Sequence, residues 1–180
     1  TGAGSVSRAR HDSGSAGAAA AERGPGADGG AAVGSSACRS ARADAVPLML
    51  VHGWPSSFLE FADLFDPLCN PPPGEPAFHV VAPSLPGYGF STTRPGINPQ
   101  RIAPLLVEHM RSLGYERFIA QGGDWGFIVT TEMARQFPEH VVGLHLNLVN
   151  GTPPPGAESI PLSPQEQAWA EELGEWTGHT

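Results

Sequence analysis

The chain has 180 residues, 40% of them hydrophobic, which is enough for one ordinary domain with a buried core. Its formal net charge is −8 and its ten basic residues, all arginine, form no basic stripe, which argues against a nucleic-acid partner. No apolar run approaches the roughly 20 residues that span a bilayer, and no signal-peptide pattern opens the chain, so we expect a cytoplasmic protein.

Residues 1–45 consist largely of Gly, Ala, Ser and Arg, with almost no large apolar side chain. Such a composition buries too little surface to offset the entropy of ordering, so we predict that this segment is disordered. The alternative is that it is not the natural start of the protein. Cys38 and Cys69 form no CxxC pattern, so we expect no disulfide framework and no metal site, and no motif calls for a cofactor.

Short apolar runs alternate with amphipathic segments from residue 46 onward. Runs that end at Gly or Pro predict buried strands, whereas apolar residues at helical spacing predict helices. The alternation predicts an α/β fold with a parallel sheet covered by helices on both faces. The expected strands are 46–53, 78–87, 117–123 and 140–149, and the expected helices are 56–68, 98–114 and 127–137.

Capping residues mark the expected starts of the first two helices. Ser57 and Glu60 have the spacing of a capping box, and Asn98 followed by Pro99 favours the start of the second helix. Pro104 lies inside that helix and is expected to kink it or to delay its start.

The C-terminal stretch differs from the rest. Residues 151–164 read as a loop, after which Ser163 and Glu166 form the capping box of another helix. Trp169, Leu173 and Trp176 make an apolar stripe on that helix, and we expect it to pack on a further part of the fold.

The stretch Gly122-Gly123-Asp124-Trp125-Gly126 joins a predicted strand to a predicted helix. This is the pattern of a nucleophile elbow, with aspartate at the position of the usual serine. An aspartate is already a carboxylate at neutral pH and can attack a strained or activated carbon directly, leaving an ester. The alternative is that Asp124 only caps the helix.

The first predicted strand ends in His52-Gly53-Trp54-Pro55. In an elbow fold the oxyanion hole uses the N–H after the nucleophile and one from the loop after an earlier strand. In this chain those two groups are the backbone N–H of Trp125 and the backbone N–H of Trp54. The simpler alternatives are that both indoles pack in the core and that His52 is a structural residue of its turn.

Four blocks together resemble the α/β-hydrolase epoxide hydrolases of the microsomal and fungal type. The blocks are LMLVHGWPSSFLEF, HVVAPSLPGYGFS, LGYERFIAQGGDWG and HVVGLHLN, and the resemblance covers about residues 46–176. It implies hydrolysis of a small-molecule epoxide to a vicinal diol through an ester on Asp124. Trp54 and Trp125 would supply the oxyanion-hole N–H groups, and their indoles would help to wall the pocket.

The resemblance also implies further catalytic residues for which this sequence shows no counterpart at a suitable position. Such enzymes use two tyrosines of a helical cap and a late histidine oriented by an acid, whereas the only tyrosines here are Tyr88 and Tyr115. The histidines after Asp124 are His140, His145 and His179, all at unsuitable positions for the base. We therefore expect a fragment, with residues 46–152 forming the N-terminal half of the hydrolase core and residues 153–180 starting a cap.

Two further expectations follow from that reading. Residues 1–45 do not resemble the N-terminal segment that the family usually carries. Half of a parallel sheet should leave an exposed edge and an uncovered apolar face, and therefore a marginally stable or aggregating protein.

Two other functions remain open. A haloalkane dehalogenase shares the aspartate nucleophile but tends to carry Asn at the position of Trp54. A non-catalytic remnant or binding module would retain the elbow without turnover.

Asn147 and Asn150 lie near a place where some related hydrolases keep their orienting acid. An amide there weighs against an arrangement in which this chain carries the orienting acid at that place. The identity of the epoxide and the oligomeric state are not encoded in any motif.

Overall fold

The computed structural model describes residues 20–23, 33–93, 95–148, 155–156 and 159–178. The chain divides into two compact units, one up to Val149 and one from Asn150. The first unit contains the sheet and the candidate site, and the second contains a single described helix. No helix in the described part of the chain is long and apolar enough to cross a membrane.

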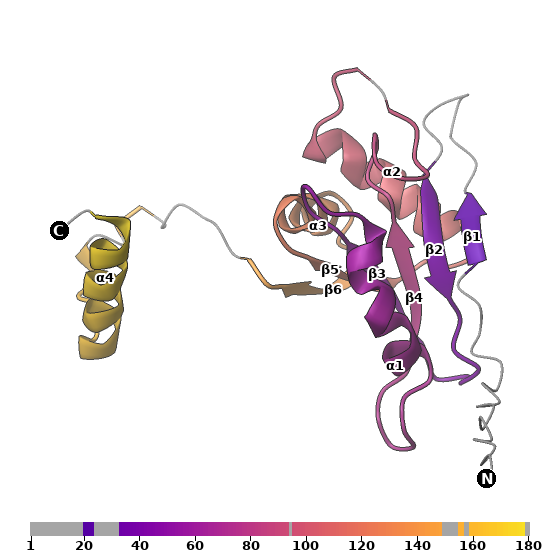
Figure 1. The fold of residues 1–180 in the computed structure, drawn as a ribbon, viewed down its shortest axis with the longest axis horizontal. Helices are drawn as coiled ribbons and strands as arrows, with labels where there is room; N and C mark the ends of the chain where they lie inside the picture. The colour runs from indigo at the N-terminus through magenta and orange to yellow at the C-terminus, as the bar shows by residue number, and fades with distance from the viewer. Residues whose placement is uncertain (1–19, 24–32, 94, 149–154, 157–158, 179–180) are drawn as a thin grey trace, which may run out of the picture. The chain divides into compact units, whose positions relative to one another are not determined.

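The first unit is built on a six-stranded sheet with the order β1-β2-β4-β3-β5-β6 (Figure 1). Strands β4, β3, β5 and β6 are parallel, as the alternation of strands and helices predicted, whereas β2 runs antiparallel to both β1 and β4. The strands are β1 Ala20–Arg23, β2 Gly34–Cys38, β3 Val46–Val51, β4 Phe78–Pro83, β5 Phe118–Gly122 and β6 Val141–Leu146.

The prediction that residues 1–45 are disordered is wrong for the described parts of that segment. β1 and β2 belong to the sheet, and all five residues of β2 are buried. The small residues of β2 suit this position, because a Cβ on Gly34 would lie 2.4 Å from the Cβ of Phe90. Ser35 Oγ also lies 2.8 Å from Nε2 of the buried His109. Backbone pairing and close packing, rather than large apolar side chains, order this strand.

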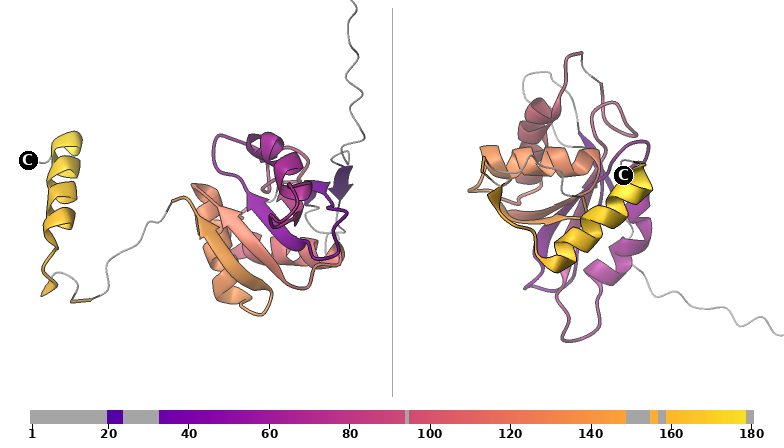
Figure 2. Two further views of the ribbon diagram at one scale, coloured as in Figure 1. Left: turned by 90° about the horizontal axis from the view of Figure 1, so that it is seen from below. Right: turned by 90° about the vertical axis from the view of Figure 1, so that its left-hand side faces the viewer.

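Helices lie on both faces of the sheet (Figure 2). α2 (Pro99–Ser112) and α3 (Trp125–Gln136) cover one face, and the 3-10 helix η2 (Phe58–Leu64) with the short α1 (Phe65–Cys69) lies on the other. Successive residues of β3 alternate between the two cores. Met49 and Val51 belong to the core under α2 and α3, and Leu48 and Leu50 to the core under η2 and α1.

Helix α2 begins where its capping residues predicted. The Asn98 side chain accepts from the backbone N–H of Arg101 at 3.0 Å, and Pro99 occupies the first helical position. Pro104 does not delay the start, because the helix runs from Pro99 through it. A proline at 104 leaves the carbonyl of Gln100 without its helical donor. The Gln136 side chain of α3 donates to that carbonyl at 3.2 Å.

The described residues cover the face under η2 and α1 only in part, in line with the uncovered apolar face that the sequence predicted. A hollow of about 670 Å³ remains there between η2, α1 and strands β3 to β6, with Leu48, Leu50 and Ile119 in its wall. β6 is the last strand of the sheet, and Val142 and Leu144 on it are 46% and 39% exposed.

The second unit contains α4 (Pro164–Thr177). The predicted capping box is confirmed: Ser163 Oγ accepts from the Glu166 N–H, and the Glu166 carboxylate accepts from the Ser163 N–H. Trp169 and Leu173 are both 59% exposed, whereas the side chain of Trp176 lies outside the described residues. The assignment of α4 to a cap stays a prediction.

Candidate active site

Asp124 lies at the sharp turn between β5 and α3. Its backbone has φ 49° and ψ −125°, the only positive φ of a non-glycine residue in the described part of the chain. A non-glycine residue in such a region costs on the order of 1–3 kcal/mol and persists only where the surroundings impose it. The elbow geometry expected from Gly-x-Asp-x-Gly is therefore present.

The turn is possible because two glycines let backbones approach one another. A Cβ on Gly126 would lie 2.1 Å from the carbonyl oxygen of Val51 in β3, and one on Gly122 would lie 2.3 Å from the carbonyl oxygen of Gly126. Any side chain at either place would push the new helix away from the strands. The glycines therefore fix where Asp124 emerges at the carboxyl end of the sheet.

The carboxylate of Asp124 is held by backbone donors. The N–H of Trp54 donates to Oδ2 at 2.7 Å, across 70 residues of sequence. Hydrogen bonds from the Trp54 and Trp125 backbone N–H groups lower the pKa of Asp124 below its ordinary value. Asp124 occupies the N-cap position of α3, but its side chain makes no capping hydrogen bond. The side chain is thus exposed and ionised, with one oxygen fixed.

The loop after β3 is shaped to bring the Trp54 N–H to this place. A Cβ on Gly53 would lie 2.6 Å from both Cβ and Oδ2 of Asp124, so only glycine fits there. The following Trp54–Pro55 peptide bond is cis.

His52 anchors the same loop from inside. It is fully buried, and its Nε2 accepts the backbone N–H of Leu85 at 3.0 Å. The remaining proton therefore sits on Nδ1, which donates to the carbonyl of Gly53 at 3.0 Å. Both ring nitrogens are committed to the backbone, so His52 has a structural role and is not free to act as a base.

A hollow of about 270 Å³ opens in front of Asp124. Trp54 lines it and is 66% exposed; Trp125 is 47% exposed but is not part of its wall. The wall consists of Gly53, Trp54, Ser56, Glu60, Phe61, Gln121, Gly123, Asp124, Asn147 and Leu148. Among the described residues that line it, none has a basic side chain.

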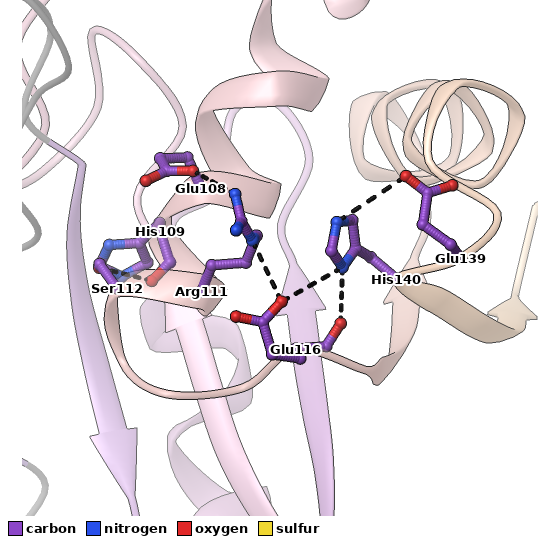
Figure 3. Close-up of polar contacts among 7 residues, drawn as sticks. All are labelled: Glu108, His109, Arg111, Ser112, Glu116, Glu139 and His140. Atoms are coloured by element: carbon purple, nitrogen blue, oxygen red, sulfur yellow. Dashed lines mark hydrogen bonds and ion pairs between the residues drawn. The ribbon is translucent and has the colours of Figure 1, made fainter.

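The histidines and tyrosines named from the sequence lie elsewhere. His140 Nδ1 lies 2.6 Å from the carbonyl oxygen of Glu116, inside a charged cluster with Arg111 and Glu139 (Figure 3). Glu116 precedes β5, whereas Asp124 follows it, so the strand separates the two by roughly 15 Å. His145 lines the larger apolar hollow instead.

Neither tyrosine reaches the hollow in front of Asp124. Tyr88 packs edge-on against the ring of His52 at 5.0 Å. Tyr115 stacks on His79 at 5.7 Å, with the Arg39 guanidinium 5.3 Å from its ring. His179 and Asn150 fall outside the described residues.

Sequence reasoning did not assign Ser56, Glu60 or Gln121 to the wall, and it named Asn147 only for its place near the orienting acid of related hydrolases. One signal was available: Gln121 is the one polar side chain of strand β5, three residues before Asp124. Glu60 and Asn147 become neighbours of Asp124 only through the packing of η2 and β6.

Comparison with known families gives two matches. Residues 46–175 match the family described as alpha/beta hydrolase fold, and residues 29–61 match the family described as Epoxide hydrolase N terminus. The second match overturns the expectation that residues 1–45 do not resemble the N-terminal segment of that family, at least from residue 29 onward.

Individual relatives agree with these matches. The chain is 48% identical over 107 residues to juvenile hormone epoxide hydrolase of Manduca sexta, and 45% identical over 108 residues to epoxide hydrolase 1 of Oryctolagus cuniculus. Each alignment covers 57% of this chain. The structure of Aspergillus niger epoxide hydrolase superimposes with a TM-score of 0.66 at 33% identity over 84% of this chain.

The chain spans only part of these proteins. It covers 23% and 24% of the two curated relatives and 41% of the Aspergillus niger structure.

Proposed function

The chain belongs to the α/β-hydrolase fold family, among the epoxide hydrolases of the microsomal and fungal type, and on this premise we propose that Asp124 opens epoxides by forming an ester with them. One observation carries the proposal: the carboxylate is ionised, exposed, and held through Oδ2 by the N–H of Trp54 at 2.7 Å. The second oxygen, Oδ1, is then the nucleophile.

In the first step, Oδ1 attacks the less hindered carbon of the epoxide, and the strained carbon–oxygen bond breaks. The epoxide oxygen leaves as an alkoxide and must take up a proton. The resemblance assigns that proton to cap tyrosines, and the two tyrosines of this chain pack away from the hollow. Water or a donor outside the described residues supplies it in the proposed reaction.

In the second step, the ester has its carbonyl oxygen at Oδ2, already in contact with the Trp54 N–H. Water attacks Cγ, and the negative charge that develops on Oδ2 is stabilised by the backbone donors of Trp54 and Trp125. Collapse of this intermediate releases the diol and restores the carboxylate. The substrates are thus a small-molecule epoxide and water.

The proposal is tested by mass spectrometry after incubation with styrene oxide and with phenyl glycidyl ether. We expect a mass increase of one epoxide molecule that maps to Asp124 and is absent in Asp124→Asn. The haloalkane dehalogenase alternative predicts the same kind of ester from 1-bromobutane with release of bromide. The binding-module alternative predicts neither a covalent product nor a diol, and a folded chain that gives neither an adduct nor the diol with either epoxide contradicts the proposed function.

A further inference from the structure

The peptide unit between Gly53 and Trp54 is hydrogen-bonded at both of its polar ends. Its N–H, which belongs to Trp54, donates to Asp124 Oδ2 at 2.7 Å. Its carbonyl, which belongs to Gly53, accepts from His52 Nδ1 at 3.0 Å. The orientation of this peptide unit decides whether the N–H points at the carboxylate. His52 therefore holds the donor of Asp124 from the side opposite the carboxylate.

A second peptide unit, between Ser84 and Leu85, is held in the same way. Its N–H donates to His52 Nε2 at 3.0 Å, and its carbonyl accepts from the Ser91 hydroxyl at 2.6 Å. Ser84, Leu85 and His52 are all buried, where a hydrogen bond is electrostatically stronger than in water. Ser91 thus acts on the peptide unit that holds His52, although Ser91 does not line the hollow in front of Asp124.

This series of hydrogen bonds begins in strand β2. The Gly34 N–H donates to Ser91 Oγ at 3.0 Å, so the single hydroxyl proton of Ser91 is available for the Ser84 carbonyl. Ser84 in turn donates its own N–H to the Gly34 carbonyl at 2.8 Å. β2 lies in the part of the chain that matches the family described as Epoxide hydrolase N terminus. A continuous hydrogen-bond path therefore joins that segment to Asp124.

Every bond of the hydrogen-bond path points in the same direction, toward Asp124. Backbone groups fix these directions, because an N–H only donates and a carbonyl only accepts. The Leu85 N–H makes His52 Nε2 an acceptor, and the Gly53 carbonyl then receives the proton of Nδ1. Hydrogen bonds aligned in this way polarise one another, by about 10–30% per bond. The Trp54 N–H at the end of the path is therefore a stronger donor than an isolated peptide N–H.

We propose that Ser91 is a positioning residue for the reaction at Asp124, a role that rests on the proposed function. Its hydroxyl acts through the Ser84–Leu85 peptide unit and His52 to orient and polarise the Trp54 N–H. That N–H stabilises the negative charge on Oδ2, first in the free carboxylate and then in the intermediate of ester hydrolysis.

The Ser91 hydroxyl is separate from the bonds that close its own turn. The Tyr88 N–H donates to the Leu85 carbonyl at 2.9 Å, and the Ser91 N–H donates to the Tyr88 carbonyl at 2.9 Å. These backbone bonds remain in Ser91→Ala. Loss of the hydroxyl should therefore weaken the hydrogen-bond path more than it weakens the fold.

The inference is tested by NMR on the whole chain labelled with ¹⁵N-tryptophan. The chain has four tryptophans, and Trp54→Phe identifies the amide signal of residue 54. A weaker hydrogen bond moves an amide proton upfield. We expect this shift at pH 7 for Trp54 in Ser91→Ala, and its reversal in Ser91→Thr, which retains a hydroxyl. Ser112→Ala is the matched control, because the Ser112 hydroxyl also donates to a backbone carbonyl, that of His109, at 2.7 Å. It should leave the Trp54 signal unchanged.

A second measurement follows Asp124 itself, through the carboxyl carbon in protein labelled with ¹³C-aspartate. Asp124→Asn identifies the signal. The Trp54 donor lowers the pKa of Asp124, so a weaker donor should raise the titration midpoint. We expect a rise of about 0.3 pH unit in Ser91→Ala, as for the loss of about 10–30% of a hydrogen bond to a charged group. The midpoint of alkylation by styrene oxide should rise equally, with a plateau rate that changes less than twofold. A role in folding alone would lower the plateau and leave the midpoint in place.

Unchanged Trp54 and Asp124 signals in folded Ser91→Ala overturn the inference. Equal shifts in Ser112→Ala overturn it too, because any lost serine hydroxyl would then have the same effect. If Ser91→Ala does not fold, Ser91→Cys replaces it, since a thiol fills the same place with a weaker donor and should shift both signals in the same direction. A wild type that gives neither adduct nor diol with styrene oxide overturns the proposed function, whereas the two NMR measurements still decide whether Ser91 acts on Asp124.

Discussion

Asp124 and Trp54 meet across 70 residues of sequence, with the Trp54 N–H donating to Asp124 Oδ2 at 2.7 Å. Two loops that follow neighbouring parallel strands, β3 and β5, make this contact. It gives the two oxygens of one carboxylate different tasks, because Oδ2 is fixed by the backbone and Oδ1 remains available. The contact depends on the residue before Trp54 having no side chain.

We predict that Gly53→Ala slows alkylation of Asp124 by styrene oxide at least tenfold. The added Cβ would lie 2.6 Å from Cβ and Oδ2 of Asp124, so the carboxylate must move off the Trp54 N–H. The rate is measured by mass spectrometry at fixed epoxide concentration. Gly143→Ala is the control, because its Cβ would meet Ile119 at an ordinary 3.5 Å. Equal rates in both variants would contradict the importance of this contact.

The pH dependence of alkylation follows from the state of the carboxylate. Hydrogen bonds from the Trp54 and Trp125 backbone lower the pKa of Asp124, so it stays ionised to a lower pH than an ordinary aspartate. The alkylation rate should be constant from pH 8 to pH 5 and fall only below the ordinary aspartate range. A rate that already falls between pH 7 and pH 5 would show that another group controls the nucleophile.

Much of this arrangement was predictable from short patterns. The parallel strands, the cap at Asn98, the capping box at Ser163 and the elbow at Asp124 depend on a few neighbouring residues, and each has a local physical cause. These features were therefore visible in the sequence alone.

The features that were missed depend on distant contacts. β2 has the composition of a disordered segment and is ordered by pairing with β4 and by the packing of Gly34 against Phe90. Glu60 gave a helix-capping signal, and only the fold brings it to the hollow of Asp124. Local composition carries no record of such neighbours.

Gly126→Ala should lower the stability of the fold, and not only the reactivity of Asp124. Its Cβ would lie 2.1 Å from the Val51 carbonyl oxygen, which is backbone and cannot rotate away. We expect a loss of about 2 kcal/mol or more in the free energy of unfolding, as for other overpacked core sites. Urea unfolding followed by circular dichroism measures this. A variant as stable as Gly143→Ala would show that α3 can shift without cost.

His109 should make the stability of the sheet unit sensitive to acid. Burial lowers the pKa of His109 from 6.5 to about 4, and its Nδ1 is buried without a hydrogen-bond partner. As the pH falls from 6.5 to about 4, the unfolded chain therefore takes up a proton that the folded chain refuses. The free energy of unfolding should decrease across this window by about 3 kcal/mol, and no further below it.

His109→Gln removes the titrating group and retains a side chain that can hydrogen-bond to Ser35. Urea unfolding at pH 7 and at pH 4.5 should give a smaller loss for this variant than for the wild type. His145→Gln, at an exposed position of β6, is the control and should lose as much as the wild type. If all three proteins lose stability equally, His109 is not the source of the acid sensitivity.

The open edge of the sheet should control aggregation. β6 has the sequence VVGLHL, with no Asp, Glu, Lys, Arg or Pro, and Val142 is 46% exposed. Uncharged edge strands of this kind pair with other chains unless a charge interrupts them. Val142→Glu should therefore slow the growth of light scattering at 37 °C severalfold. Ala62→Glu adds the same charge at an exposed position of η2, and it should aggregate at nearly the wild-type rate if the edge is responsible. Equal slowing in both variants would instead assign the effect to net charge.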